Sequence, residues 1–265
     1  MNDEAPAIEA TYFTDPLCSW SWAMEPAWRR LRYEFGEQLA WRYRMGGMIA
    51  DWSNYSDPIN SISRPAQMGP VWMQVRHMSG MPLDDRLWID DPPESSYPAC
   101  IAFKAAEMQS PEAAERYLRR LREAAMMRRR NIARREVLLE IADDLAERGP
   151  DEFDTARFEA DLDGRAAREA FREDLKLARY REIGRYPTLL LQRPGEDAGL
   201  LMVGYRPYEV LRSALRRLAP ELAPLRSFEG AEEYAAYWGG VLDRELAEIA
   251  GGAASPAAAS SQSQT

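Results

Sequence analysis

The hydrophobic pattern at the start of the chain predicts a strand, a helix and a second strand. Ile8 to Thr14 (IEATYFT) is a short β-rich run, and Asp15-Pro16 ends it with a turn signal. From Trp20 to Phe35, apolar residues recur at spacings of three and four, which is typical of a helix, and Pro26 predicts a kink or a late start. Leu39 to Met45 then alternates apolar and polar positions, as a half-buried strand does. This order favours a parallel strand pair joined by a right-handed crossover.

The middle of the chain shows no strand pattern and is expected to be helical. Residues 51 to 98 are rich in Pro, Gly, Met and Trp, which predicts short helices and loops. Helical spacing of apolar residues then follows at 95–109, 112–130, 134–148 and 165–183.

The last third of the chain returns to strands. Pro187 to Gln192 (PTLLLQ) and Gly199 to Gly204 (GLLMVG) are apolar runs joined by turn residues, which predicts a β-hairpin. One helix is expected from Pro207 to Leu218 and a second over residues 229–249. From Gly251 onward the chain is almost all Gly, Ala, Ser and Gln, so this tail is expected to be disordered.

These elements predict an α/β fold in which a large α-helical insertion interrupts one sheet. We expect residues 1–50 and 184–225 to form the sheet-containing domain and residues 51–183 to form the helical insertion domain. Residues 226–250 are then a C-terminal helix, and 251–265 are the disordered tail.

Composition narrows the possible partners and location. The 265 residues carry a formal net charge of −9, which disfavours nucleic acid and anionic membranes as partners. No stretch approaches the roughly 18 apolar residues that a membrane span requires. Asp3 and Glu4 stand where a signal peptide would carry positive charge, so a cytoplasmic protein is expected.

Cysteine and histidine are too scarce for a disulfide framework or a zinc site. The only cysteines are Cys18 and Cys100, and the only histidine is His77, to which we assign no role. No metal or bound cofactor is predicted.

Cys18 is the strongest candidate for chemistry because it lies where the first helix begins. Unpaired amides and the helix dipole favour negative charge there, which predicts a lowered pKa for the thiol. Ser21 lies one turn further along the same face, where its hydroxyl could donate a hydrogen bond to the Cys18 thiolate. The alternative is that Cys18 is simply a small buried apolar residue.

The second candidate element is Gly184-Arg185-Tyr186-Pro187-Thr188. A proline that opens a strand lies at an edge or a special turn, and X-Pro is the only common cis bond. A cis Tyr186–Pro187 bond would present the Tyr186 backbone to an extended peptide. The alternative is an ordinary edge proline.

Together these segments resemble the DsbA-like branch of the thioredoxin superfamily. The similarity rests on DPLCSWSWA after the first strand, the helical insertion, YPT at the third strand and the later GYRPYEVLRSAL, and it spans most of residues 8–220. It implies a thioredoxin-like fold in which Cys18 attacks disulfides and Tyr186-Pro187-Thr188 forms the cis-proline loop facing it. Trp20 is then expected to pack beside the sulfur.

One departure from the family changes the expected mechanism. In that family a second cysteine resolves the mixed disulfide, but Ser21 occupies its position, which makes this chain a CxxS variant. Such a protein is expected to act as a thiol-disulfide oxidoreductase or isomerase on protein thiols and disulfides through Cys18 alone. An external thiol such as glutathione, as co-substrate, would resolve the adduct; Cys100 is a weaker alternative for that role.

Two other functions remain open at this point. Kappa-type glutathione transferases and hydroxychromene-carboxylate isomerases share the helical insertion but typically carry Ser where Cys18 stands. A non-catalytic adaptor that uses the fold to bind a protein partner would also lack a resolving cysteine. Fold alone does not separate these functions.

Overall fold

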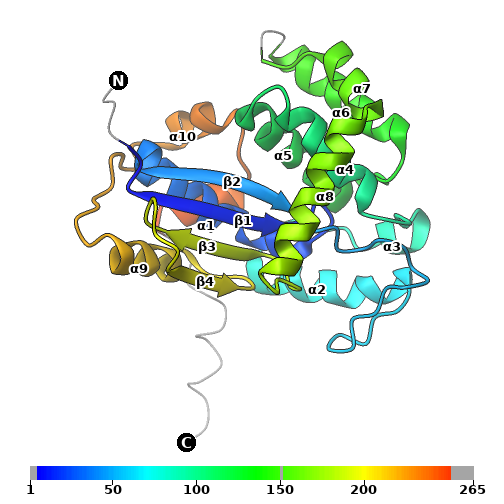
Figure 1. The fold of residues 1–265 in the computed structure, drawn as a ribbon, viewed down its shortest axis with the longest axis horizontal. Helices are drawn as coiled ribbons and strands as arrows, with labels where there is room; N and C mark the ends of the chain where they lie inside the picture. Colours follow the sequence, from blue (N-terminus) through cyan, green and yellow to red (C-terminus); the bar gives the residue numbers. More distant parts are fainter. Residues whose placement is uncertain (1–4, 150–151, 252–265) are drawn as a thin grey trace, which may run out of the picture.

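A four-stranded sheet forms the centre of the protein, as seen in a computed structural model that describes residues 5–149 and 152–251 (Figure 1). The strand order is β2-β1-β3-β4. Strand β1 (Ile8–Thr14) pairs in parallel with β2 (Leu39–Met45) and antiparallel with β3 (Thr188–Gln192), which pairs antiparallel with β4 (Gly199–Val203). The predicted parallel pair and the predicted hairpin are therefore both confirmed.

Helices cover the two faces of the sheet unequally. Helix α1 (Ser19–Phe35) and helix α9 (Tyr208–Leu218) lie behind the sheet in Figure 1, and α8 (Arg165–Tyr180) crosses the front of it near one end. Helix α1 runs unbroken through Pro26, so the predicted late start was wrong. A short 3-10 turn, η1 (Gly36–Gln38), leads from α1 into β2.

The insertion between β2 and β3 is helical, as expected. Its elements are η2 (Pro65–Gln67), α2 (Met68–Ser79), α3 (Leu87–Asp90), α4 (Tyr97–Glu107), α5 (Pro111–Arg128), α6 (Arg135–Arg148) and α7 (Thr155–Asp163), followed by α8. The sequence pattern did not predict α7, because only Phe158 and Leu162 of this helix are buried apolar residues. The Asp154 side chain caps its first turn by accepting a hydrogen bond from the Arg157 amide.

The C-terminal region differs from the single helix expected over residues 229–249. The structure has two short helices, α10 (Ala231–Trp238) and α11 (Asp243–Ile249). Gly239 and Gly240 separate them with φ angles of 64° and 123°, which residues with a side chain rarely adopt. Of the tail expected to be disordered, only Gly251 belongs to the described residues.

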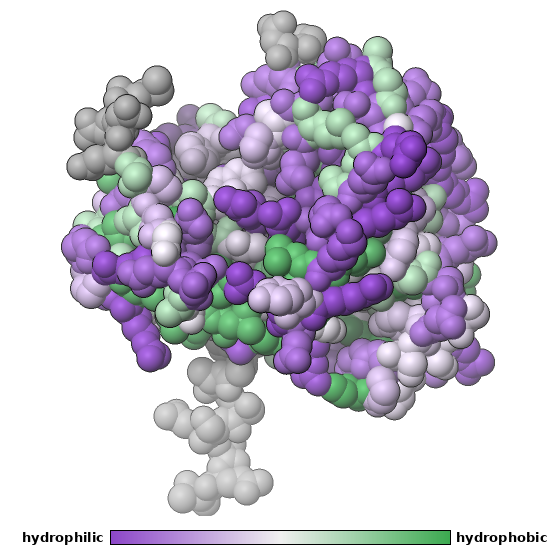
Figure 2. Space-filling model, viewed as in Figure 1, coloured by the Kyte–Doolittle hydropathy of each residue, from purple (hydrophilic) through white to green (hydrophobic). Residues whose placement is uncertain are grey.

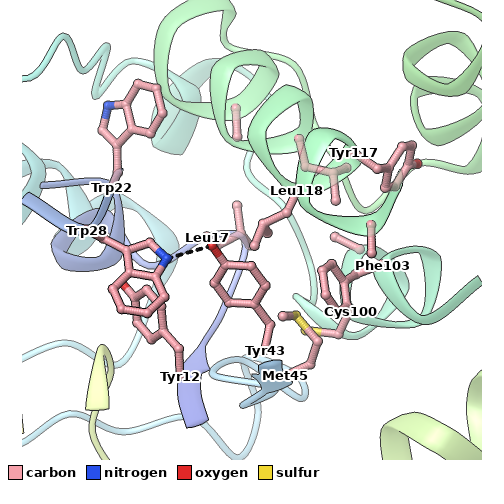
Figure 3. Close-up of a cluster of buried hydrophobic side chains, with 14 of the residues drawn as sticks. Tyr12, Leu17, Trp22, Trp28, Tyr43, Met45, Cys100, Phe103, Tyr117 and Leu118 are labelled. Atoms are coloured by element: carbon pink, nitrogen blue, oxygen red, sulfur yellow. Dashed lines mark hydrogen bonds between the residues drawn. The ribbon is translucent and has the colours of Figure 1, made fainter. Parts of the chain in front are cut away.

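One hydrophobic core joins the sheet to the insertion (Figure 3). Tyr12 of β1, Trp28 of α1 and Tyr43 of β2 meet there, and the Trp28 Nε1 donates a hydrogen bond of 2.9 Å to the Tyr43 hydroxyl. Phe103 and Cys100 of α4 extend the same cluster. The predicted division into domains stays a prediction.

The surface in the view of Figure 2 is mostly hydrophilic, with an apolar area over β4. Leu201 and Val203 of that edge strand are half exposed. None of the helices in the described ranges is long and apolar enough to span a membrane.

Candidate functional site

The structure places Cys18 at the N-cap position of α1, one residue before the helix begins. The preceding turn is fixed by Asp15, whose carboxylate accepts a hydrogen bond from the Leu17 amide and whose carbonyl accepts one from the Cys18 amide. The amides of Ser21 and Trp22 in turn donate to the Cys18 carbonyl, which starts the helix.

The proline loop lies directly opposite this helix start. The Tyr186–Pro187 peptide bond is cis. The Cys18 thiol donates a hydrogen bond of 3.4 Å from Sγ to the Tyr186 carbonyl. The fold therefore brings together two segments that are 168 residues apart in the sequence.

The lowered pKa expected for Cys18 was wrong in direction. The residue is only 4% exposed, and burial raises the pKa of its thiol because a thiolate loses its hydration there. Hydrogen bonds from the Ser21 side chain and amide lower it in part, but they do not reverse the effect of burial. The Tyr186 carbonyl also favours the protonated thiol, since only that form donates a hydrogen bond.

The other predicted site residues differ in how near they come to the thiol. Ser21 is fully buried next to it. Trp20 borders the cavity beside Cys18, with its ring 6.2 Å from the ring of Tyr205. Thr188 is fully buried, and its hydroxyl donates to the Arg185 carbonyl at 2.7 Å. The Thr188 hydroxyl is therefore engaged in a hydrogen bond within the proline loop.

A cavity of about 870 Å³ borders the Cys18 side of the molecule. Trp20, Tyr55 and Tyr205 supply aromatic side chains to its wall, and Arg185 and Tyr186 contribute from the proline loop. The remainder of the wall comes mainly from residues 46–62 and from α2. Of the methionines in the sequence segment 45–81, Met48, Met68 and Met78 line this cavity.

Gly46 holds the proline loop in place, a role that the sequence did not reveal. The Tyr186 hydroxyl donates to the Gly46 carbonyl at 3.0 Å. A Cβ at Gly46 would lie 2.1 Å from the Tyr186 ring, so only glycine permits this contact without a shift. The Gly46-Gly47 pair that directly follows β2 is the signal that could have indicated it.

Asp15 is a second residue whose role the sequence did not predict, because it was interpreted only as part of a turn. Its Oδ2 accepts hydrogen bonds from the Met48 amide at 2.7 Å and from the Ser96 hydroxyl at 2.8 Å. The Cys100 thiol donates to the same oxygen at 3.5 Å. Burial raises the pKa of Asp15 even though these bonds and the Leu17 amide oppose it.

Cys100 does not border the cavity lined by Cys18. It is fully buried in α4. Burial, followed by the Asp15 charge, raises the pKa of its thiol well above the ordinary value. A packed structural cysteine fits this placement better than a resolving thiol.

The residues that the structure describes contain no cluster of three or more His, Cys, Asp or Glu able to hold a metal ion. At the site itself, Cys18 supplies one thiol to a partly aromatic cavity. Such a site can form a mixed disulfide, or it can hold a polypeptide without reacting.

Comparison with known proteins identifies relatives of this chain in sequence and in fold. The thioredoxin family profile matches residues 12–213. The "ClpXP adapter protein SpxH" of Halalkalibacterium halodurans is 29% identical over 226 residues, which cover 84% of this chain and 72% of the relative. Adapters of the same name from Bacillus subtilis and Bacillus cereus are also 29% identical.

Solved structures with the same fold include disulfide-handling proteins. A putative protein disulfide isomerase from Nitrosomonas europaea has a TM-score of 0.65 at 22% identity, covering 80% of this chain and 96% of its own. The cytosolic disulfide reductase DsbM from Pseudomonas aeruginosa has a TM-score of 0.62 at 24% identity, covering 80% and 100%. DsbM has also been solved with GSH, with a TM-score of 0.55 at 21% identity, covering 87% and 97%.

The matched profile, over residues 12–213, covers most of the chain. This chain belongs to the thioredoxin family.

Proposed function

We propose that this protein is a thioredoxin-fold adapter that binds a polypeptide partner in the cavity beside Cys18. The observation that carries the proposal is the state of the thiol. Cys18 is 4% exposed, burial raises its pKa, and Ser21 replaces the cysteine that would resolve a mixed disulfide. A disulfide catalyst needs a reactive thiolate and a route to release its adduct, and this site favours neither.

Similarity to the relatives named ClpXP adapters supports the same function and suggests the protease. By that similarity, the protein would deliver its bound partner to ClpXP. An adapter needs one surface for the partner and another for the protease. The cavity is the better candidate for the partner, since its aromatic wall and the exposed Ile59 at its rim offer contact area to an extended segment.

The proposal is tested by measuring protease binding and redox turnover on the same full-length protein. We expect saturable binding to purified ClpX, followed by fluorescence anisotropy of the protein labelled at its N-terminus. A Cys18→Ala variant should bind equally well, because the thiol takes no part in protease binding. With glutathione present, the protein should not accelerate insulin reduction. Cys18-dependent turnover, or no binding to ClpX, would contradict the proposal.

Monothiol exchange with glutathione is the second candidate. The observation in its favour is that Cys18 both borders the cavity and contacts the loop before Pro187, which is where the family places its attacking thiol. A glutathione adduct on Cys18, found by mass spectrometry and cleared by excess reduced glutathione, would support this function. A Ser21→Cys variant should then gain a reversible disulfide between Cys18 and the introduced thiol, together with a higher turnover.

Both candidates place the protein in the cytoplasm, where ClpXP and reduced glutathione are found. Protein thiols or glutathione would be the partners of the catalytic candidate, and a client polypeptide the partner of the adapter.

A further inference from the structure

A chain of buried hydrogen bonds runs from the helical insertion to the residue next to the thiol. Arg122 of α5 donates from Nη2 to the Thr14 Oγ1 at 2.6 Å. Thr14, the last residue of β1, donates from that hydroxyl to the Ser21 Oγ at 2.8 Å. Thr14 and Ser21 are fully buried, and Arg122 is 1% exposed.

The chemistry of the three groups fixes the direction of this chain. A guanidinium only donates, so the Thr14 oxygen must accept from Arg122. The single Thr14 proton is then committed to Ser21. The Ser21 oxygen is already an acceptor, and its own proton remains free to point at Cys18. The two hydrogen bonds therefore run from the positive charge to Ser21, whose side chain lowers the pKa of Cys18.

We propose that Arg122 is a positioning residue that controls the acidity of Cys18 through Thr14 and Ser21. The three residues are called the Arg122 relay below. The inference concerns the thiol itself and does not depend on whether the protein is an adapter or a catalyst. By this proposal, a residue of the helical insertion influences the pKa of the thiol at the N-terminus of α1.

Arg122 remains charged in its buried position because acidic and phenolic groups surround it. Burial has the largest effect and lowers its pKa, but Glu25, Tyr12, Tyr43 and Cys18 together raise it above the ordinary value. Glu25 of α1 accepts a hydrogen bond of 2.5 Å from the Arg122 Nη1. One nitrogen of the guanidinium thus donates to Glu25, and another donates to Thr14.

The charges that act on Cys18 oppose one another. Asp15, from the turn before α1, raises the thiol pKa, and Arg122, from α5, lowers it. Both effects are smaller than those of burial and of the Ser21 hydrogen bonds. The charge of the Cys18 thiolate in turn adds to the effect of burial in raising the pKa of three nearby tyrosines, Tyr12, Tyr55 and Tyr186. The relay therefore offsets part of the burial cost without making Cys18 a thiolate in the resting protein.

Neutralising Glu25 does not by itself account for the contact between Arg122 and Thr14. Arg29 and Arg119 also lie 3.8 Å from Glu25, so its charge has other partners. The bond to Thr14 leads away from that carboxylate and toward the thiol. A purely structural ion pair would not need it.

The test is the pH dependence of Cys18 alkylation in Thr14→Val, which keeps the shape of the side chain but removes the hydroxyl. Iodoacetamide labelling from pH 6 to 11, quantified on the Cys18 peptide by mass spectrometry, gives the rate and its pH profile. We expect Thr14→Val to slow labelling at pH 8 by about fivefold and to move the profile to higher pH, since the hydrogen bond that links Ser21 to Arg122 is lost. Thr14→Ser, which restores the hydroxyl, should follow the wild-type profile.

Two further variants show whether the effect runs through the relay. The double variant Glu25→Gln with Arg122→Gln removes both charges together, and it should move the profile in the same direction as Thr14→Val. Thr11→Val is the matched control on β1, because no relay hydrogen bond involves Thr11, and its profile should equal that of the wild type. A Thr14→Val profile that superimposes on the wild-type profile would overturn the proposal. An equal shift in Thr11→Val would do the same.

Discussion

The surroundings of Cys18 and Cys100 differ sharply although both thiols are buried and both are influenced by Asp15. Cys18 lines the large cavity, and the Ser21 hydrogen bonds oppose the effect of burial on its pKa. Cys100 lies inside the core of the insertion, and its thiol donates to the Asp15 carboxylate. The Asp15 charge adds to the effect of burial on the Cys100 pKa.

This difference teaches that two buried cysteines can offer very different surroundings to a thiolate. The distinguishing features are an adjoining cavity and nearby hydrogen-bond donors that favour the thiolate. Cys18 has both. Cys100 borders no such cavity, and the Asp15 carboxylate opposes the one donor, the Gly47 amide, that favours its thiolate. The following predictions test this contrast, beginning with the largest effect.

Asp15→Ala should affect both thiol regions at once. Removing the carboxylate leaves the buried amides of Leu17 and Met48 and the Ser96 hydroxyl without the acceptor that they now share. We expect a loss of about 3–4 kcal/mol in the free energy of unfolding, measured by urea denaturation. The control is Asp197→Ala, an exposed residue in the β3–β4 turn, which should change stability by less than about 0.5 kcal/mol. Equal losses in the two variants would contradict the role of Asp15.

The raised pKa of Asp15 also predicts a pH dependence of stability. Because the folded protein binds this proton more tightly than the unfolded chain, the contribution is fully present below pH 3.8 and is lost as the pH rises through the folded pKa. The free energy of unfolding of the wild type, minus that of Asp15→Asn, should therefore fall as the pH rises from 3.8. A difference that stays constant with pH would argue against the raised pKa.

Alkylation should separate the two cysteines kinetically. At pH 8, Cys18 should react with iodoacetamide about 100-fold faster than Cys100, since Cys100 becomes accessible only when the core opens. The Cys18 rate should still be rising at pH 9, because burial raises its pKa above the ordinary value of 9.0. Peptide-level mass spectrometry measures both rates in one sample. Similar rates for the two thiols would show that the cavity gives Cys18 no advantage.

Gly46→Ala should disturb the Cys18 side alone. The new methyl group would collide with the Tyr186 ring and push the proline loop away, at a cost of about 2 kcal/mol in thermal or urea unfolding. Gly69→Ala in α2 is the matched control, because the nearest atom would be 3.7 Å from its Cβ. That variant should be neutral or slightly stabilising. A loss confined to Gly69→Ala would refute this account of Gly46.

Replacing each cysteine with alanine should have the smallest effects on the free energy of unfolding, and the loss should be larger at Cys100 than at Cys18. Cys100→Ala is expected to cost about 1–2 kcal/mol, since it leaves a small void inside the core. Cys18→Ala should cost about 0.5 kcal/mol or less, because its sulfur borders a cavity that already exists. Urea unfolding of the two variants gives both values, and the reverse order would contradict the contrast.

Local pattern was enough to predict most elements of the fold. The alternation in Leu39–Met45 and the helical spacing after Trp20 depend on neighbours a few positions apart, and the structure confirms both elements. The same reasoning failed at α7, which has too few apolar residues to give a clear period. It also failed at Gly239-Gly240, where positive φ angles break the expected helix.

Sequence alone therefore determined the order of the strands and helices along the chain, the helical insertion and the two segments that meet at the site. Tertiary structure decided how acidic the Cys18 thiol is, because desolvation and charge depend on residues far away in the sequence. The Arg122–Thr14 hydrogen bond joins positions 108 residues apart, and the Cys18–Tyr186 contact joins positions 168 apart. A pattern of neighbours along the chain carries no information about such pairs, so the expectation from the helix terminus gave the wrong direction for the pKa.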